Sequence, residues 1–162
     1  MENITTIEID KENIKFSAAH FTIFSAEERE RLHGHNFSVY LSITVPVGPN
    51  GMCFSYKKLK DIIRAECDRL DEYTLIAADS PYLEISPQDK YYAINFNSEK
   101  MLLLQKDTLL LPVRNTTVEE FARYLLSQLL KDSDFIDQYD VRTLKIKVSS
   151  GPGQSGSADW KK

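Results

Sequence analysis

The chain has 162 residues and a mass of 18.6 kDa, with 42% hydrophobic and 27% charged residues. This balance excludes a disordered chain and a coiled coil, and the length predicts a single domain over residues 1–162. A net charge of −4 argues against a nucleic-acid partner. No apolar run reaches the roughly 18 residues of a membrane span, so we expect no membrane partner. Without a basic stretch and apolar core at the start, we expect a cytoplasmic protein.

The first third of the chain alternates apolar and polar residues, which predicts β-strands. The alternation over residues 7–18 is interrupted at 10–13, which indicates one interrupted strand or a strand pair. A charged loop is expected over 21–34. From His35 to Val47 the period of two is unbroken, and the Gly-Pro-Asn-Gly sequence at 48–51 predicts a turn.

The middle of the chain changes to helical spacing. An apolar stripe over residues 56–72 predicts a helix, and Cys67 on that stripe is expected to be a buried core thiol. Residues 73–89 show no regular pattern. An extra hairpin is expected around residues 90–112, with short strands at Tyr91–Phe96, Met101–Leu104 and Thr108–Leu111.

The sequence patterns in the last third of the chain predict one helix and one clear strand. Thr117 and Glu120 have the spacing of a capping box, and the apolar stripe behind them predicts a second helix. A polar connection over 137–140 leads to a strand at Val141–Val148. This order of elements predicts an α+β fold with an antiparallel sheet and helices on one face.

All three histidines of the chain lie within sixteen residues: His20, His33 and His35. In extended backbone, His33 and His35 point the same way, and His20 ends a predicted strand that can lie beside them. Three imidazoles without a thiolate are typical of a catalytic zinc site with one open position. Three unrelated histidines remain the alternative at this stage.

The histidines lie in motifs that resemble a known family. Phe-Ser-Ala-Ala-His at 16–20 and Leu-His-Gly-His-Asn-Phe at 32–37 resemble the 6-pyruvoyl-tetrahydropterin synthase family, which includes the 6-carboxytetrahydropterin synthases. The segments at 50–59, 115–120 and 148–154 are also similar to that family. The resemblance covers most of the chain except the stretch around residues 76–112.

The resemblance implies a tunnelling fold, in which a four-stranded antiparallel sheet carries two helices on one face. Subunits of such a fold join their sheets into a trimeric barrel, and two trimers pair into a homohexamer. The resemblance also implies that the three histidines hold Zn²⁺. In the family, zinc binds the side-chain hydroxyls of 7,8-dihydroneopterin triphosphate and acidifies adjacent C–H bonds, while a protein base moves protons.

The chain departs from the family pattern at three functional positions. Arg29 stands where the family has a catalytic cysteine, Glu72 where it has a histidine after Asp71, and Ser150 where it has a glutamate that anchors the pterin. Arginine cannot act as a base, so any base must come from elsewhere.

Carboxylates near these positions are the candidate bases. Glu30 is favoured over Glu28 because Glu30 is only three residues from His33, and Asp71 with Glu72 could form an acid/base pair. Solvated surface charges are the alternative for each of them. The candidate ligand-binding residues are Thr116, Thr117, Ser150 and Gln154.

The sequence thus predicts a zinc-dependent lyase that acts on a reduced pterin such as 7,8-dihydroneopterin triphosphate. The alternative is a metal-binding homologue without lyase activity that binds a pterin or a purine-like ligand. The three missing side chains favour the alternative, whereas the intact set of histidines favours a working metal site.

Overall fold

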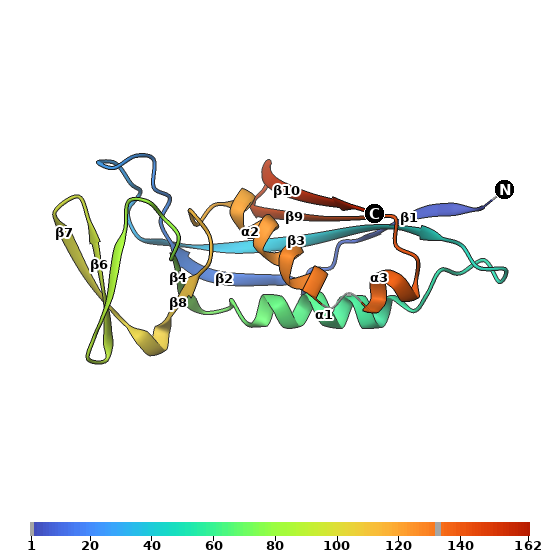
Figure 1. Cartoon of the computed structure of the whole chain (residues 1–162), viewed down its shortest axis with the longest axis horizontal. Coiled ribbons are helices and arrows are strands. Elements are labelled where there is room, and N and C mark those ends of the chain that lie inside the picture. Colours follow the sequence, from blue (N-terminus) through green and yellow to red (C-terminus); the bar gives the residue numbers. More distant parts are fainter. Residues whose placement is uncertain (1, 132–133) are drawn as a thin grey trace.

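The structure is a computed structural model that describes residues 2–131 and 134–162 (Figure 1). Within these ranges the elements are β1 (Ile4–Ile9), β2 (Lys15–His20), β3 (His33–Pro46), α1 (Tyr56–Asp68), β4 (Tyr73–Ala77), β5 (Glu84–Gln88), β6 (Tyr91–Phe96), β7 (Glu99–Leu104), β8 (Thr108–Leu111), α2 (Val118–Lys131), α3 (Asp134–Gln138), β9 (Thr143–Gly151) and β10 (Gln154–Lys161). A single 3₁₀ turn at Gln105–Asp107 precedes β8. None of the described helices is both long and apolar enough to cross a membrane.

The main sheet has the order β10-β9-β3-β2-β4-β8, and β1 pairs with the far end of β3. From β10 through β9 and β3 to β2, each strand pairs antiparallel with the next, so the predicted antiparallel core is confirmed. The expectation that the sheet has only four antiparallel strands is wrong, because β4 and β8 extend it in parallel. The alternation at residues 7–18 forms two strands that share β3 as a partner.

A second sheet, β5-β6-β7, lies at one end of the molecule, opposite the N-terminus (Figure 1). The predicted hairpin at 90–112 is therefore wrong in extent, because this antiparallel sheet spans residues 84–104. Residues 108–111 form β8, which pairs with β4 in the main sheet. The strand predicted at Thr108–Leu111 is therefore present, but it does not belong to the hairpin. The continuous apolar run of β4 is typical of a parallel strand and shows no alternation, so its sequence did not predict a strand.

The helices α1 and α2 pack on one face of the main sheet, as predicted. The first helix ends at Asp68, four residues before the expected end, and α3 occupies part of the expected polar connection. Every second residue of β3 from Phe37 to Val45 is buried in this layer. The buried helical residues that face the sheet layer are Leu59, Ile63, Cys67, Phe121, Ala122, Leu125 and Leu129.

The start of α2 is fixed by two hydrogen bonds and by close packing of β10. The Thr117 hydroxyl accepts a hydrogen bond from the Glu120 amide at 3.4 Å, as the capping box predicts. The Glu120 carboxylate reaches farther back than expected and accepts from the Arg114 amide at 3.0 Å. Strand β10 passes so close to the helix that a Cβ on Gly156 would lie 2.7 Å from the Glu119 backbone nitrogen. These contacts hold the first turn of α2 beside the ends of β2 and β3.

Candidate metal centre

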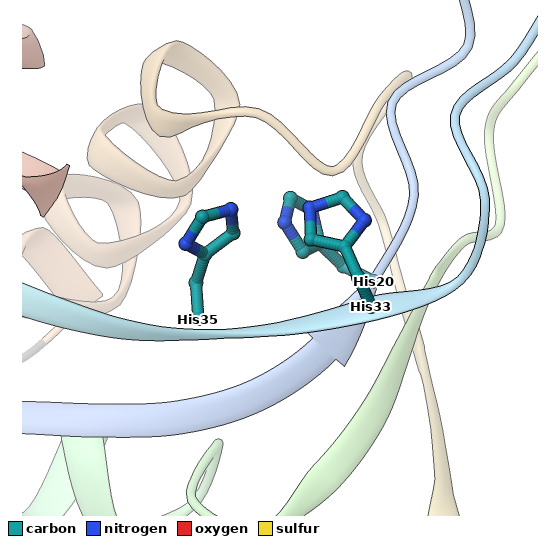
Figure 2. A group of neighbouring side chains, drawn as sticks. All are labelled: His20, His33 and His35. Carbon is teal, nitrogen blue, oxygen red and sulfur yellow. The ribbon is translucent and has the colours of Figure 1, made fainter.

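The three histidines lie together where β2 ends and β3 begins. His20 pairs with His33 across the two antiparallel strands, and His35 is opposite Ala18. Because all three side chains belong to the helix-facing side of the sheet, their rings rise together toward the start of α2 (Figure 2). The ring centroids are 4.8 Å apart for His20–His33 and His33–His35, and 5.3 Å apart for His20–His35.

Backbone carbonyls orient two of the three rings. The His20 Nδ1 lies 2.7 Å from the Thr116 carbonyl oxygen, and the His33 Nδ1 lies 2.7 Å from the Arg31 carbonyl oxygen. A carbonyl can only accept, so each Nδ1 carries the proton and each Nε2 keeps a free lone pair. Among the described residues, the buried His20 Nε2 has no hydrogen-bond partner. An unpartnered buried nitrogen of this kind fits a metal ligand.

The geometry of the histidines suits a divalent metal such as zinc. One nitrogen from each ring lies within 4.8 Å of the others. Tetrahedral zinc with Zn–N bonds of about 2.0–2.1 Å needs ligand nitrogens about 3.4 Å apart, so modest side-chain rotations complete the site. Burial lowers the pKa of His20, as do His33 and His35, and these effects outweigh the Thr116 carbonyl and Glu30. His20 therefore favours the neutral form that a metal requires.

An aromatic cluster lies beneath the histidines. Phe37 stacks on Phe16 at 4.9 Å between ring centroids and meets Phe121 of α2 edge-on at 5.0 Å. His20 contacts the Phe37 ring edge-on at 5.2 Å. Since these phenylalanines are fully buried in the core, the imidazoles rest on a closely packed base.

Glu30 is the candidate base that the structure places beside the histidines. Its Oε2 lies 3.9 Å from the His33 Nε2 and accepts a hydrogen bond from the Thr22 amide at 2.9 Å. Burial raises the pKa of Glu30, but the hydrogen bonds from Thr22 and the nearby His33 and His20 outweigh it and lower the pKa overall. Thr22 and the two histidines therefore favour the ionised form of this carboxylate.

A cavity of about 300 Å³ opens beside the metal centre. Three of the four candidate ligand-binding residues line it, together with Glu30: Thr117, Ser150 and Gln154. The Gln154 Nε2 donates to the Ser150 hydroxyl at 2.9 Å, so these two side chains already form a polar pair. Thr116 lies behind His20 instead, where its buried hydroxyl donates to the Phe21 carbonyl.

The remaining candidate carboxylates lie elsewhere. Glu28 is exposed in the loop before β3 and does not line the cavity. The Asp71 Oδ1 accepts a hydrogen bond from the Ser17 amide at 2.6 Å, which ties β2 to the start of β4. Glu72 lines a different hollow of about 540 Å³, which also includes His35 and Asn36 but neither of the other two histidines. Within one chain, the structure therefore brings only Glu30 of these four carboxylates to the cavity at the histidines.

Sequence reasoning missed the groups that hold the site in place. Thr22, which binds the Glu30 carboxylate, and the carbonyl oxygens of Arg31 and Thr116 act through the backbone. Backbone groups have no residue-specific signature, so only the folded arrangement reveals them. Thr22 and Glu119, which also line the cavity, likewise carried no recognisable motif.

Comparison with known proteins identifies the family. Residues 8–159 match the model of the family described as 6-pyruvoyl tetrahydropterin synthase. The chain belongs to the 6-pyruvoyl tetrahydropterin synthase family. The fold agrees: a crystal structure of the 6-pyruvoyl tetrahydropterin synthase from Plasmodium vivax matches with a TM-score of 0.94 and 25% identity, covering 99% of each chain.

Other relatives carry related names. The Plasmodium falciparum 6-pyruvoyl tetrahydropterin synthase matches with a TM-score of 0.93 and 23% identity over 99% of each chain. A Methanocaldococcus jannaschii protein provisionally assigned as 6-carboxy-5,6,7,8-tetrahydropterin synthase is 22% identical over 142 residues, covering 87% of this chain and 86% of that protein. Two further P. vivax structures carry alanine or cysteine in place of a glutamate identified as a catalytic residue of that enzyme.

Arg29, which stands where the synthase family was expected to have cysteine, does not direct its side chain to the histidines. Its guanidinium lies over the rings of Phe21 and Phe96 and bonds to Glu99 at 3.0 Å. Arg29 is not among the residues that line the cavity at the histidines. Glu30, the next residue, takes the place beside His33 instead.

Proposed function

We propose that this chain is a zinc-dependent lyase that acts on 7,8-dihydroneopterin triphosphate or a close analogue, as a 6-pyruvoyl- or 6-carboxytetrahydropterin synthase. The observation that carries the proposal is a cluster of three imidazoles with one carboxylate beside it, of which His20, His35 and Glu30 line a single cavity. His20, His33 and His35 each offer one ring nitrogen as a ligand, and Glu30 lies 3.9 Å from the His33 Nε2. Membership of the synthase family supports the same substrate class.

The histidines would hold the metal, with Nδ1 of His20 and His33 fixed by carbonyl oxygens. When bound there, zinc would polarise the substrate hydroxyl groups and acidify the neighbouring C–H bonds. The chain's own contribution is a preorganised pocket, because the packed phenylalanines beneath the rings resist movement of the ligands.

Glu30 would serve as the base. An ionised carboxylate accepts a proton from the acidified C–H bond, and the Thr22 amide keeps one of its oxygens in a fixed direction. Thr117, Ser150 and Gln154 on the cavity wall would contact the pterin ring or its side chain. Glutamate also serves as a catalytic residue in the P. vivax synthase, which supports a carboxylate in place of the expected thiol.

A matched pair of variants tests the base. Glu30→Gln removes the charge but keeps the shape, so we expect zinc content to stay unchanged and triphosphate release from dihydroneopterin triphosphate to fall about 10²-fold or more. Glu28→Gln is the control, because Glu28 is an exposed glutamate of the same loop, and its turnover should match the unmodified protein. Equal turnover in the Glu30 variant would show that Glu30 is not the base.

Metal analysis tests the ligands independently of turnover. We expect one zinc per subunit, and we expect His33→Ala and His35→Ala each to lose it, because two imidazoles hold zinc far less tightly than three. Unchanged zinc content in both variants would contradict the assignment of the ligands.

One observation favours the alternative of a metal-binding homologue without lyase activity. The cavity wall presents Ser150, a short hydroxyl, at the position expected to hold the pterin-anchoring glutamate. If the zinc-loaded protein binds a reduced pterin or a purine-like ligand in calorimetry but releases no triphosphate, the alternative is the function.

A further inference from the structure

The Arg29 side chain contacts both its own loop and residues distant in sequence. Its guanidinium carbon lies 5.2 Å from the Phe21 ring centroid and 5.6 Å from that of Phe96. The Nη2 donates to the Glu99 carboxylate at 3.0 Å, and the Nη1 donates to the Glu30 carbonyl at 2.9 Å. Only 18% of the side chain is exposed, so the ion pair is partly shielded from water.

Two of these groups belong to the three-stranded sheet. Phe96 ends β6 and Glu99 begins β7, so Arg29 bonds to the turn between these strands. Asn97 in the same turn donates to the Glu27 carbonyl at 3.4 Å. The turn therefore contacts the loop before β3 at two points, while β5, β6 and β7 supply none of the described residues that line the cavity at the histidines.

The same arginine fixes the peptide groups around Glu30. The Glu30 amide donates to the Thr22 carbonyl at 2.8 Å, and the Glu30 carbonyl accepts from Arg29. The Thr22 amide in turn donates to the Glu30 carboxylate. The peptide units on both sides of Glu30 are thus each held by a hydrogen bond, and neither can rotate without breaking it, so the carboxylate stays beside His33.

We propose that Arg29 is a positioning residue for the reaction proposed above, and that it holds Glu30 in place by anchoring the loop to the β6–β7 turn. The inference rests on the proposed function of Glu30. It gives the three-stranded sheet a role in the site without contact between the sheet and the substrate. Arginine suits this role because a planar guanidinium stacks on aromatic rings while it donates several hydrogen bonds, which lysine cannot reproduce.

The first test is a double-mutant cycle with Arg29→Met, which fills the space between the rings but lacks the donors. We expect kcat to fall about 10-fold to 100-fold with unchanged zinc content and KM, because misplacing a catalytic group by about 1 Å has effects of that size. In the Glu30→Gln background, Arg29→Met should lower kcat no more than about twofold further, since it acts through Glu30. Independent, multiplying losses would overturn the proposal.

The second test is amide hydrogen exchange, which does not depend on turnover. In Arg29→Met and in Glu99→Gln, the Thr22 and Glu30 amides should exchange faster than in the unmodified protein, with a larger effect for Arg29→Met. Lys100→Met, which changes an exposed residue next to Glu99, is the control and should leave both amides unchanged. Wild-type exchange rates in Arg29→Met would overturn the anchor itself. If the unmodified protein releases no triphosphate, the proposed function is wrong. The exchange rates would then still show whether Arg29 anchors the loop to the β6–β7 turn.

Discussion

His20 connects the metal centre to the rest of the fold through one ring. Its Nδ1 binds the Thr116 carbonyl just before α2, and its Nε2 is left for a metal. The Thr116 hydroxyl also donates to the Phe21 carbonyl, which follows His20 in the chain. The end of β2 and the start of α2 therefore form one hydrogen-bonded unit, and a shift of either would turn the imidazole away from the other two ligands.

The cysteines give a residue-level prediction about the chemistry. Burial raises the pKa of the Cys67 thiol to about 12, and nearby carboxylates add to the effect. A protonated, buried thiol does not react as a nucleophile, so Cys67 cannot replace the missing catalytic thiol. We expect a thiol reagent to modify only the partly exposed Cys53 in the folded protein and both cysteines after unfolding.

One control variant, measured in two ways, makes the thiol experiment decisive. Cys53→Ala should show no reactive thiol until it is unfolded, and its triphosphate release should equal that of the unmodified protein. Rapid labelling of Cys67 in the folded protein, or loss of turnover on labelling, would contradict the expectation that a carboxylate performs the proton transfer.

At the scale of elements, the contact between β10 and α2 predicts an intolerant glycine. A methyl group on Gly156 would lie 2.7–2.8 Å from backbone atoms of Val118 and Glu119, and a backbone cannot move aside as a flexible side chain can. We expect Gly156→Ala to lower the free energy of unfolding by about 1–3 kcal/mol, the usual cost of overpacking. Chemical denaturation measures this loss.

The neighbouring residue supplies the control for Gly156. Ser157 is exposed on the same strand, so Ser157→Ala should change the free energy of unfolding by no more than about 0.5 kcal/mol. Because the contact lies at the first turn of α2, Gly156→Ala should also weaken zinc binding through Thr116 and His20. Equal stability of the two variants would show that β10 can move away from the helix at little cost.

The elements that sequence predicted are those with a local pattern. Strands β2 and β3 follow the period of two, and α1 and α2 follow an apolar stripe, because one face of each is buried and the other is not. Strand β4 was missed because its apolar residues run without alternation. Strand β5 was missed because it is mostly exposed and contains Pro87.

The residues of the site also fall into two groups: those that a local sequence pattern predicts, and those whose contacts depend on the folded chain. The histidines were predicted because their spacing matches the two-residue repeat of a strand, which places ligands on one face without knowledge of the fold. The contacts of Arg29 could not be predicted, since Glu99 and Phe96 are about 70 residues away and join it only through the three-stranded sheet. The position of Glu30 was inferred from its distance in sequence to His33, but its partner Thr22 depends on the folded loop.

At the scale of the whole molecule, one edge of the main sheet is the largely exposed strand β10. In the described part of the chain, β10 pairs with β9 on one side only, although β10 has eight residues. A long unpaired strand is a surface for association with another chain, and the family resemblance implies sheets that join into trimers. We therefore expect a homohexamer, a dimer of trimers, with a mass by light scattering of six times the 18.6 kDa of one chain.

Hydrogen exchange distinguishes this assembly from one that forms through another face. An antiparallel edge strand in a monomer directs only alternate amides toward its partner, so the other amides of β10 would exchange freely. Pairing of β10 with a neighbouring subunit protects both sets, so we expect slow exchange at successive residues from Gly156 to Trp160. A monomer at micromolar concentration would contradict the barrel, and a hexamer with alternating exchange in β10 would place the subunit contact elsewhere.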